Sequence, residues 1–381
     1  MGNAAHGRLI LCDTSNFVDF PIGGQLTSIH NFLHYICDND PERAERIVLV
    51  GLTLDQAEVG HFHPIELFGR RLLYYPVMLA EADLGHTRHS VRLQYVKGLL
   101  RHGRGLKLTR SDCVYINTPE AFGPLRLLSP RSRFVAFTHQ NYFDMVASFR
   151  FYQDKKLVLW GFNRYLIYML RRLDLAFALS APAEEAYRRV GARNVVRVNN
   201  SIVCPQDITP GSISRHRMLF VGRLSLNKGI ETIIKAVLEL PSVYTLTIVG
   251  EGEEHDRLVP YACDRIIFTG SVAPHQVREY LRDADILIMN SGYEGLPMTI
   301  LEAQSMGLPV VTTDVGGIGE AVRYGTDAEP TDGTTASIQE AIALIEGDYG
   351  RYSAAALENA RRFDYRIANR PVYEALVRYW R

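Results

Sequence analysis

Residues 217–237 read RMLFVGRLSLNKGIETIIKAV, and the order of structure that they predict recurs along the chain. The apolar run at 217–224 is typical of a strand buried on both faces, and Gly229 opens a helix after a short polar loop. Because such strands alternate with helical segments through the sequence, the pattern predicts parallel, doubly wound α/β sheets.

The alternation occurs twice and predicts two domains. In the first part of the chain, strands are expected at 8–14, 46–52, 71–77, 113–119, 133–139, 175–181 and 195–203. In the second part, strands are expected at 217–224, 244–252, 265–272, 285–291 and 309–314. The Pro-, Gly- and Ser-rich stretch 205–216 separates the two sets and is the predicted linker. We therefore predict an N-terminal domain at 1–204 and a C-terminal domain at 217–364, a division that suits 381 residues.

The composition excludes several classes of protein. Apolar residues make up 47% of the chain and charged residues 22%, as in soluble globular proteins, and a formal net charge of zero argues against a nucleic-acid partner. Five scattered cysteines without metal spacing, and the lack of an apolar leader, predict a cytoplasmic protein. The Asp-x-Asp triplets at 38–40 and 283–285 fit turns and helix caps, so no metal site is expected.

The stretch NSGYEGLPMTILE (290–302) has the most specific chemistry. Pro297 fits the first turn of a helix, and the free N–H groups near Met298 and Thr299 would bind an anion. Glu294 precedes this helix and Glu302 lies one turn inside it. Carboxylates repel phosphate but accept hydrogen bonds from sugar hydroxyls. The spacing therefore suits a nucleotide sugar, a diphosphate flanked by two sugars, although a surface glutamate pair beside a Gly-Leu-Pro turn has the same spacing.

Other loops at strand ends carry candidate ligand-binding residues. Gly222 and Arg223 end one strand and Lys228 follows, so two cations could hold a diphosphate, unless both are simply solvated. TIVGEGEE (247–254) lacks a complete GxGxxG and is weak evidence by itself. His139 ends another strand, where ligands bind in open parallel sheets, although a capped core histidine is the alternative.

These segments together resemble a known family. GGQ near the start, FVGRLSLNKG, TIVGEGEE and GYEGLPMTILEAQSMGLPVVTTDVGG are similar, in order and spacing, to the retaining glycosyltransferases of family 4. That family has the GT-B architecture, two Rossmann-like parallel-sheet domains facing across a cleft. The resemblance is strong over 217–322 and weak over 55–110, and the chain has Asn200-Ser201 where the family usually has Asn-Gly. It also implies that the terminal segment 365–381 packs back on the N-terminal domain.

The resemblance implies roles for individual residues. Glu302 matches the glutamate that binds the nucleotide ribose, and Glu294 matches the one that contacts hydroxyls of the donor sugar. The implied catalytic residues are Arg223, Lys228, Glu294 and His139. The implied donor-binding residues are Gly23, Gly24, Gly222, Ser271, Val272, Gly295, Leu296, Pro297, Met298, Thr299 and Glu302.

The expected function is the metal-independent, retaining transfer of a sugar from a nucleoside-diphosphate sugar, with UDP as the expected nucleotide. The acceptor would be a hydroxyl of a sugar or of a lipid-linked glycan, in glycan, glycolipid or polysaccharide synthesis, and no cofactor is expected beyond the donor. Three alternatives stay open: a nucleotide-sugar-binding protein without transfer, a GT-B UDP-sugar epimerase and, least favoured, an NAD-dependent dehydrogenase.

The charge distribution suggests a further partner. Residues 1–204 hold 25 Lys and Arg against 18 Asp and Glu, whereas residues 205–381 hold 17 against 24. The stretch 88–110 has seven basic residues and no acidic one, and Val91, Tyr95, Leu99 and His102 could share one face of a helix there. We therefore expect that 88–110 can contact an anionic membrane surface, while the basic and aromatic segment 155–172 packs in the domain core. A solvated helix at 88–110 and an anionic soluble acceptor are the alternatives.

Overall fold

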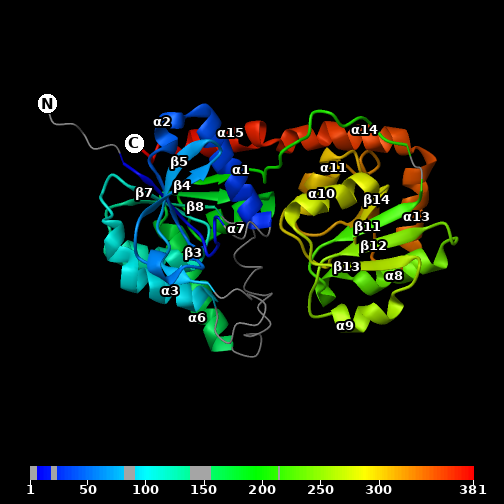
Figure 1. Ribbon diagram of the computed structural model, residues 1–381, viewed down its shortest axis with the longest axis horizontal. Helices are drawn as coiled ribbons and strands as arrows, with labels where there is room; N and C mark the ends of the chain where they lie inside the picture. Colours follow the sequence, from blue (N-terminus) through cyan, green and yellow to red (C-terminus); the bar gives the residue numbers. More distant parts are fainter. Residues whose placement is uncertain (1–6, 19–23, 81–90, 138–155, 213–214) are drawn as a thin grey trace. The chain divides into compact units, whose positions relative to one another are not determined.

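The computed structural model describes residues 7–18, 24–80, 91–137, 156–212 and 215–381 (Figure 1). The chain divides into two compact units. The first contains residues 1–199 and 369–381, and the second contains residues 200–368.

The first unit is built on an eight-stranded sheet with the order β10-β9-β8-β7-β1-β2-β5-β4, in which only β4 is antiparallel to its neighbour. Its strands are β1 (Leu9–Cys12), β2 (Ile47–Val50), β4 (His63–Leu67), β5 (Arg70–Tyr74), β7 (Cys113–Ile116), β8 (Arg133–Phe137), β9 (Leu175–Ala178) and β10 (Val195–Arg197). A separate parallel pair consists of β3 (Leu52–Thr53) and β6 (Met78–Leu79).

Helices cover both faces of this sheet. The helices α3 (Val91–His102), α4 (Phe122–Leu128), α6 (Lys156–Arg172) and α7 (Ala181–Arg189) share one apolar core with the strands. On the other face, Phe32 of α1 (Gly24–Asn39) stacks on Tyr115 of β7 with ring centroids 5.6 Å apart. The short α2 is Pro41–Ala44, and α15 is Tyr365–Leu376. Three layers therefore enclose the apolar strands, as expected for a parallel sheet.

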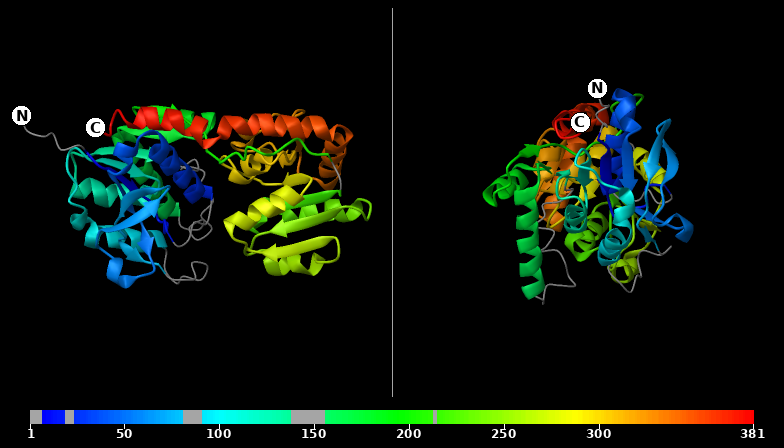
Figure 2. Two further views of the ribbon diagram at one scale, coloured as in Figure 1. Left: turned by 45° about the horizontal axis from the view of Figure 1, so that its top comes forward. Right: turned by 90° about the vertical axis from the view of Figure 1, so that its left-hand side faces the viewer.

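The second unit has a six-stranded, fully parallel sheet with the order β13-β12-β11-β14-β15-β16. Its strands are β11 (Arg217–Val221), β12 (Thr245–Val249), β13 (Ile266–Gly270), β14 (Ile286–Met289), β15 (Val310–Thr313) and β16 (Ala328–Thr331). Its helices are α8 (Ile230–Glu239), α9 (His255–Leu258), α10 (Pro274–Asp283), α11 (Met298–Ser305), α12 (Ile318–Ala321), α13 (Thr335–Gly347) and α14 (Tyr349–Ala360). The apolar faces of α8 and α13 meet in one core, and α11 packs with α14 (Figure 2).

Each sheet has one switch point, where the order of the strands reverses. In the first unit β1 lies between β2 and β7, and in the second β11 lies between β12 and β14. Consecutive connections run to one side of the first strand and later ones to the other side. Crevices at the carboxyl ends of the strands open at such points, here between β1 and β7 and between β11 and β14.

All twelve expected strands are present, each shorter than its apolar run. The sequence missed β3, β4, β6 and β16. The side chains of β4 alternate between exposed and half-buried, and β16 contains Pro330 at a sheet edge, so neither resembles a buried parallel strand.

The two segments expected between and after the domains have defined partners. Gly211, inside the expected linker 205–216, belongs to the second unit and donates its N–H to Ser353 Oγ over 2.8 Å. At the other end, Trp380 is fully buried in the first unit and donates its indole N–H to the Gly7 carbonyl over 3.0 Å. The units divide at 199/200 and again at 368/369, within α15.

Among the described residues, no helix combines the length and the apolar content that crossing a membrane requires.

Candidate functional site

Two loops meet at the switch point of the second unit. One follows β11 and the other follows β14, and these strands are neighbours, with Met218 opposite Ile286. The Asn227 carbonyl accepts the N–H of Gly292 over 2.8 Å, and the Asn227 side chain donates to the Tyr293 carbonyl over 3.2 Å. These bonds bring the residues that follow Asn227 and Tyr293 together.

Lys228 and Glu294 form an ion pair at this junction. Lys228 Nζ donates to Glu294 Oε1, and Ser291 Oγ donates to the same oxygen over 2.7 Å. The side chains are only 20% and 13% exposed, so the pair is partly withdrawn from water. The sequence predicted a phosphate ligand and a sugar ligand here, and the structure shows that these two groups also balance each other's charge.

Arg223, the second predicted cation, has a different environment. Its side chain is 75% exposed, and its Nε donates to Glu253 Oε2 over 3.1 Å. An exposed pair of this kind contributes little stability, so the guanidinium can exchange its partner at low cost.

The helix α11 begins immediately after the loop that carries Glu294. Pro297 is the N-cap rather than a first-turn residue, and no side chain caps the helix start. The N–H groups of Met298 and Thr299 therefore lack a side-chain cap and are available to an anion. Asn200, the first residue of the Asn200-Ser201 pair, donates its side-chain N–H to the Leu296 carbonyl over 2.8 Å and fixes the approach to the helix.

Glu302 lies one turn inside α11. Burial raises the pKa of its carboxyl to about 7, and the positive charge of Arg278 on α10 opposes that rise. Burial therefore favours the protonated carboxyl in the free protein more than water would for an exposed glutamate. The sequence analysis did not identify Arg278, because an exposed arginine on a polar helix carries no local signal.

Close backbone contacts shape both sides of the switch point. Gly250 has φ +133°, and a Cβ atom there would lie 2.0 Å from the Gly222 carbonyl oxygen. Gly316 has φ +61°, and a Cβ atom there would lie 1.9 Å from the Glu294 carbonyl oxygen. Only glycine fits these two positions, so the glycines in TIVGEGEE and DVGG serve the packing of the loops.

The remaining predicted residues are distributed as follows. Ser271 and Val272 directly follow β13, whose last residue, Gly270, accepts the N–H of Gly250 over 2.9 Å. Gly24 is the exposed first residue of α1, at the carboxyl end of the first sheet. Gly23 and His139 lie outside the described residues.

The sequence analysis missed a second polar cluster, at the switch point of the first unit. Asp13 follows β1 and accepts hydrogen bonds from Ser15, Gln25 and, over 3.5 Å, Thr118. Burial raises the pKa of the Asp13 carboxyl to about 6, although these bonds lower it. Asn117 follows β7 and is 4% exposed, and neither polar atom of its side chain has a partner among the described residues. A buried amide without partners at this position is a candidate ligand contact. Its only sequence signal is its place after an apolar strand.

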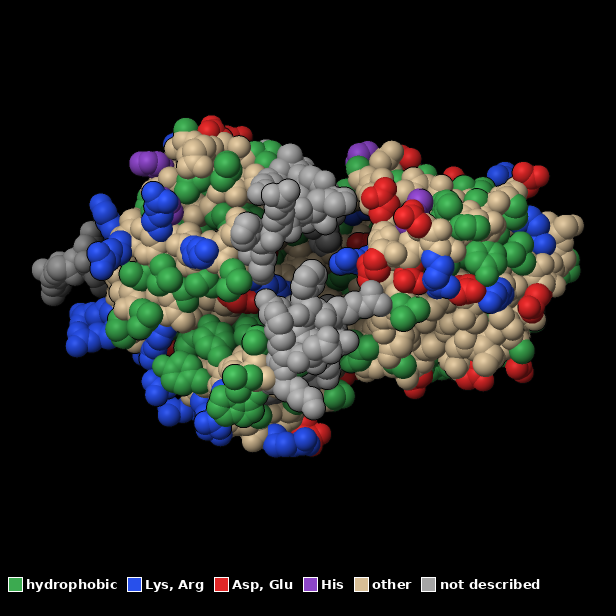
Figure 3. Space-filling model, turned by 90° about the horizontal axis from the view of Figure 1, so that it is seen from below, with side chains coloured by type: hydrophobic (Ala, Val, Ile, Leu, Met, Phe, Trp, Pro, Cys, Tyr) green, Lys and Arg blue, Asp and Glu red, His purple; other side chains and the backbone are tan. Residues whose placement is uncertain are grey.

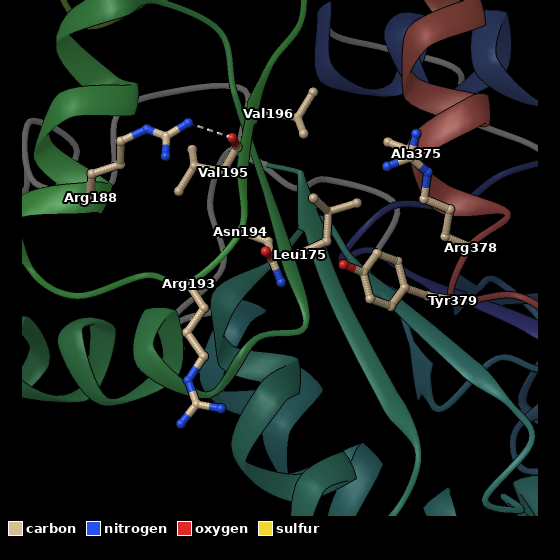
Figure 4. Close-up of a pocket in the computed structure, with 9 residues that line it drawn as sticks. All are labelled: Leu175, Arg188, Arg193, Asn194, Val195, Val196, Ala375, Arg378 and Tyr379. Atoms are coloured by element: carbon tan, nitrogen blue, oxygen red, sulfur yellow. Dashed lines mark hydrogen bonds between the residues drawn. The ribbon is translucent and has the colours of Figure 1, made fainter.

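The described residues also contain a pocket of about 250 Å³ in the first unit (Figure 4). Its lining residues come from β9, α7, β10 and the C-terminal segment: Leu175, Arg188, Arg193, Asn194, Val195, Val196, Ala375, Arg378 and Tyr379. Arg188 donates hydrogen bonds to Glu184 and to the Val195 carbonyl. None of the predicted site residues lines the pocket.

No group of three His, Cys, Asp or Glu residues with metal-binding geometry occurs in the described ranges. In the two Asp-x-Asp triplets, Asp40 caps α2 through the N–H of Arg43, and Asp285 accepts the N–H of Arg217 over 2.8 Å.

Comparisons with known proteins show what the chain resembles. Residues 215–347 match the family described as glycosyl transferases group 1. The chain is 32% identical over 163 residues to the glycogen synthase of Mycobacterium tuberculosis, an alignment that covers 40% of this chain and 38% of that protein. Alignments with other curated relatives likewise cover only part of those proteins, from 25% to 57% of their length.

Solved structures match almost the whole chain. Sucrose-phosphate synthase from Thermosynechococcus elongatus superimposes with a TM-score of 0.78 and 16% identity, covering 98% of both chains. Anabaena Alr3699/HepE in complex with UDP-glucose gives a TM-score of 0.67 and 20% identity, covering 98% of this chain and 100% of that one. This likeness concerns the fold, and it shows that the chain has the GT-B fold with two Rossmann-like α/β domains.

Proposed function

We propose that this protein is a retaining glycosyltransferase of family 4, which transfers a sugar from a nucleoside-diphosphate sugar to an acceptor hydroxyl without a metal ion. The observation that carries the proposal is the Lys228–Glu294 pair beside the uncapped start of α11. It places a cation, a carboxylate and free N–H groups at one switch point, as a diphosphate joined to a sugar would require. The match to glycosyl transferases group 1 spans all of these residues.

The proposed donor is a UDP-sugar. A structure with the same fold was solved in complex with UDP-glucose, which supports this nucleotide. Arg223, Lys228 and the N–H groups of Met298 and Thr299 would hold the diphosphate. The Glu302 carboxylate would accept hydrogen bonds from the ribose. The backbone of Ser271 and Val272 would contact the base.

Transfer breaks the bond between the anomeric carbon and the diphosphate oxygen and forms a bond from that carbon to the acceptor oxygen. The acceptor proton passes to an oxygen of the departing diphosphate, on the face where the acceptor attacks. Negative charge grows on the diphosphate as it leaves. Arg223, Lys228 and the start of α11 stabilise that charge without a metal ion. Glu294 accepts hydrogen bonds from donor-sugar hydroxyls and orients the sugar.

The acceptor side rests on the first unit. Asp13 and Asn117 offer a buried carboxyl and an amide with free hydrogen-bonding capacity. These groups suit the hydroxyls of a sugar or polyol better than an anion, since Asp13 would repel one when ionised. His139, Gly23 and Gly24 keep their predicted roles at the donor sugar and phosphate.

The test is incubation with a panel of UDP-sugars, with and without sugar and polyol acceptors. Release of UDP that depends on an acceptor, and an α-linked product from an α-linked donor by NMR, are the expected results. EDTA should leave the rate unchanged.

Other outcomes would contradict the proposal. Donor binding without product would indicate a binding protein, and conversion of the donor sugar without an acceptor would indicate an epimerase. A product with inverted anomeric configuration would exclude the retaining mechanism.

A further inference from the structure

We infer that the outer face of α3, α4 and α6 in the first unit docks on an anionic phospholipid membrane, with α6 as the apolar anchor. Exposed apolar side chains, the cations around them and the packing that holds them outward support this inference. It does not depend on the proposed catalytic activity.

One face of the helix α6 carries exposed apolar side chains, as a membrane anchor requires. Leu157 is 81% exposed and Trp160 is 62% exposed, although the buried Leu166 and Met169 fix the opposite face of the same helix in the core. The segment 155–172, expected to pack in the core, therefore has two faces. The expected packing in the core holds for its inner face, and the sequence alone did not show which of its apolar side chains stay exposed.

The outer stripe of α6 changes from apolar to basic along its length. Leu157 and Trp160 are followed at helical spacing by Arg164, Tyr168 and Arg171. The Arg164 guanidinium lies over the Trp160 ring at 5.8 Å. Tryptophan with neighbouring arginine is suited to a membrane interface, where the ring is half-desolvated and the cation meets lipid phosphate.

The helix α3 adds cations, but not through the face that the sequence suggested. Tyr95 and Leu99, which were expected to share one face of this helix, are fully buried in the core. The exposed stripe instead contains Leu93 and Leu100, which are 58% and 55% exposed, together with the exposed cations Lys97 and Arg101, and the exposed Arg104 follows just after the helix. Arg92 pairs with Glu120 at 3.1 Å and Arg88 lies outside the described residues, so neither is included among the proposed membrane-binding cations.

The three helices form one layer. Tyr165 of α6 accepts the N–H of Gly123 in α4 over 3.1 Å, and α4 packs in turn on α3. Leu127 of α4 adds a side chain that is 78% exposed. Viewed from the side of α3 and α6, the first unit shows hydrophobic side chains bordered by Lys and Arg (Figure 3).

The charge of this region selects the partner. In the described parts of this region, residues 91–137 and 156–173, there are 13 Lys and Arg against 2 Asp and Glu, a net charge of +11. Of the acidic residues described there, Asp112 pairs with Arg8 and Glu120 with Arg92, and both are buried or nearly so. Exposed apolar groups among unopposed cations match a surface with negative headgroups above hydrocarbon.

The fluorescence of Trp160 reports binding to vesicles. The chain has two tryptophans, and the other, Trp380, is fully buried. Vesicles of phosphatidylcholine, with or without phosphatidylglycerol, are titrated into the protein while its fluorescence is recorded, and flotation measures binding directly. Anionic vesicles should shift Trp160 emission to the blue and brominated lipid should quench it. Neutral vesicles, or about 0.5 M salt with a Debye length of roughly 4 Å, should abolish both effects.

Variants separate the contribution of the cations from that of the exposed apolar side chains. Lys97→Glu, Arg101→Glu and Arg104→Glu together should weaken partitioning at least about 100-fold, the factor expected from three cations at about 1 kcal/mol each. Leu157→Ser with Trp160→Ser should abolish flotation. The matched controls are the exposed Arg71, Arg193 and Arg197, each changed to Glu, and the exposed Val243 and Leu344 of the second unit, each changed to Ser. Both control variants should bind as the unchanged protein does.

Several results would overturn the inference. Failure of the unchanged protein to float with anionic vesicles at low salt is one, and equal losses in the test and control variants are another. Binding to DNA or to an acidic protein without binding to vesicles would assign this face to a different partner.

Discussion

Lys228 and Glu294 lie 66 residues apart in the sequence, yet they form an ion pair where the loops after β11 and β14 meet. Each group is proposed to bind a different part of the donor. In the free site the two charges therefore neutralise each other. When the donor binds, it must either separate Lys228 from Glu294 or bind to both while they stay paired.

The first prediction concerns Glu294. Glu294→Gln should lower kcat about 10²–10³-fold with a small change in donor KM, because orientation of the sugar is required in the transition state. Steady-state kinetics with the best donor measure both constants. The control is Glu231→Gln, which removes a carboxylate paired with Lys235 in the same unit but outside the site. If Glu294→Gln turns over at the normal rate, Glu294 does not contact the reacting sugar.

The second prediction concerns the cations. Arg223→Ala and Lys228→Ala should each lower kcat about 10²–10³-fold through loss of charge stabilisation on the leaving diphosphate. Because Lys228 contacts Glu294, Lys228→Ala combined with Glu294→Gln should lose less than the sum of the two changes. Lys235→Ala, on α8, is the control. A strict requirement for Mg²⁺ or Mn²⁺ in the unchanged protein would show that a metal, rather than these cations, carries the charge.

The third prediction concerns Glu302 and pH. Its folded-state pKa of about 7 lies above the ordinary glutamate value of 4.5, so burial favours the protonated form. The contribution of Glu302 to the free energy of unfolding is fully present below pH 4.5 and is lost as the pH rises through 7. At 1.36 kcal/mol per pKa unit, the loss reaches about 3 kcal/mol. Glu302→Gln should therefore raise the Tm of the free protein at pH 8 and leave it nearly unchanged at pH 4.5.

The same substitution should weaken donor binding. The ribose hydroxyls need an acceptor carboxylate, so the affinity of the unchanged protein should fall as the pH drops below 7, and Glu302→Gln should remove that dependence. Calorimetric titration with UDP across this range measures the effect. Glu279→Gln, an exposed glutamate on α10, is the control. A UDP affinity that is independent of pH in the unchanged protein would rule out Glu302 as a ribose ligand.

The fourth prediction concerns Asp13 and Asn117. Asp13→Asn and Asn117→Ala should raise the acceptor KM at least about tenfold, because each removes a hydrogen-bonding group from the first unit. Hydrolysis of the donor without acceptor should continue at its normal rate. Asn194→Ala, an exposed amide in the first unit, controls for the loss of an amide. Equal losses in transfer and hydrolysis would assign the cluster to folding.

Local pattern was sufficient to predict most of the elements. The strands β11 and β14, expected from the apolar runs 217–224 and 285–291, have buried centres, as a run that is apolar on both faces predicts for a central parallel strand. The expected residues after β11 and β14 did come together, since strands on the two sides of a switch point end at the same edge. The edge strands β4 and β16 were missed because they carry the composition of loops, whereas the edge strands β10 and β13 were predicted from their apolar runs.

Only the tertiary structure decided which groups pair and which face is covered. The sequence marks Lys228 and Glu294 separately, but their contact depends on a strand order that joins β11 to β14 across 66 residues. The buried Asn117 likewise acquires meaning from β1 lying beside β7. The sequence shows α6 to be apolar and basic, whereas only the packing of Leu166 and Met169 in the core shows that Leu157 and Trp160 lie on the exposed face. Composition fixes what a segment can bury, and the packing of distant elements determines what it does bury.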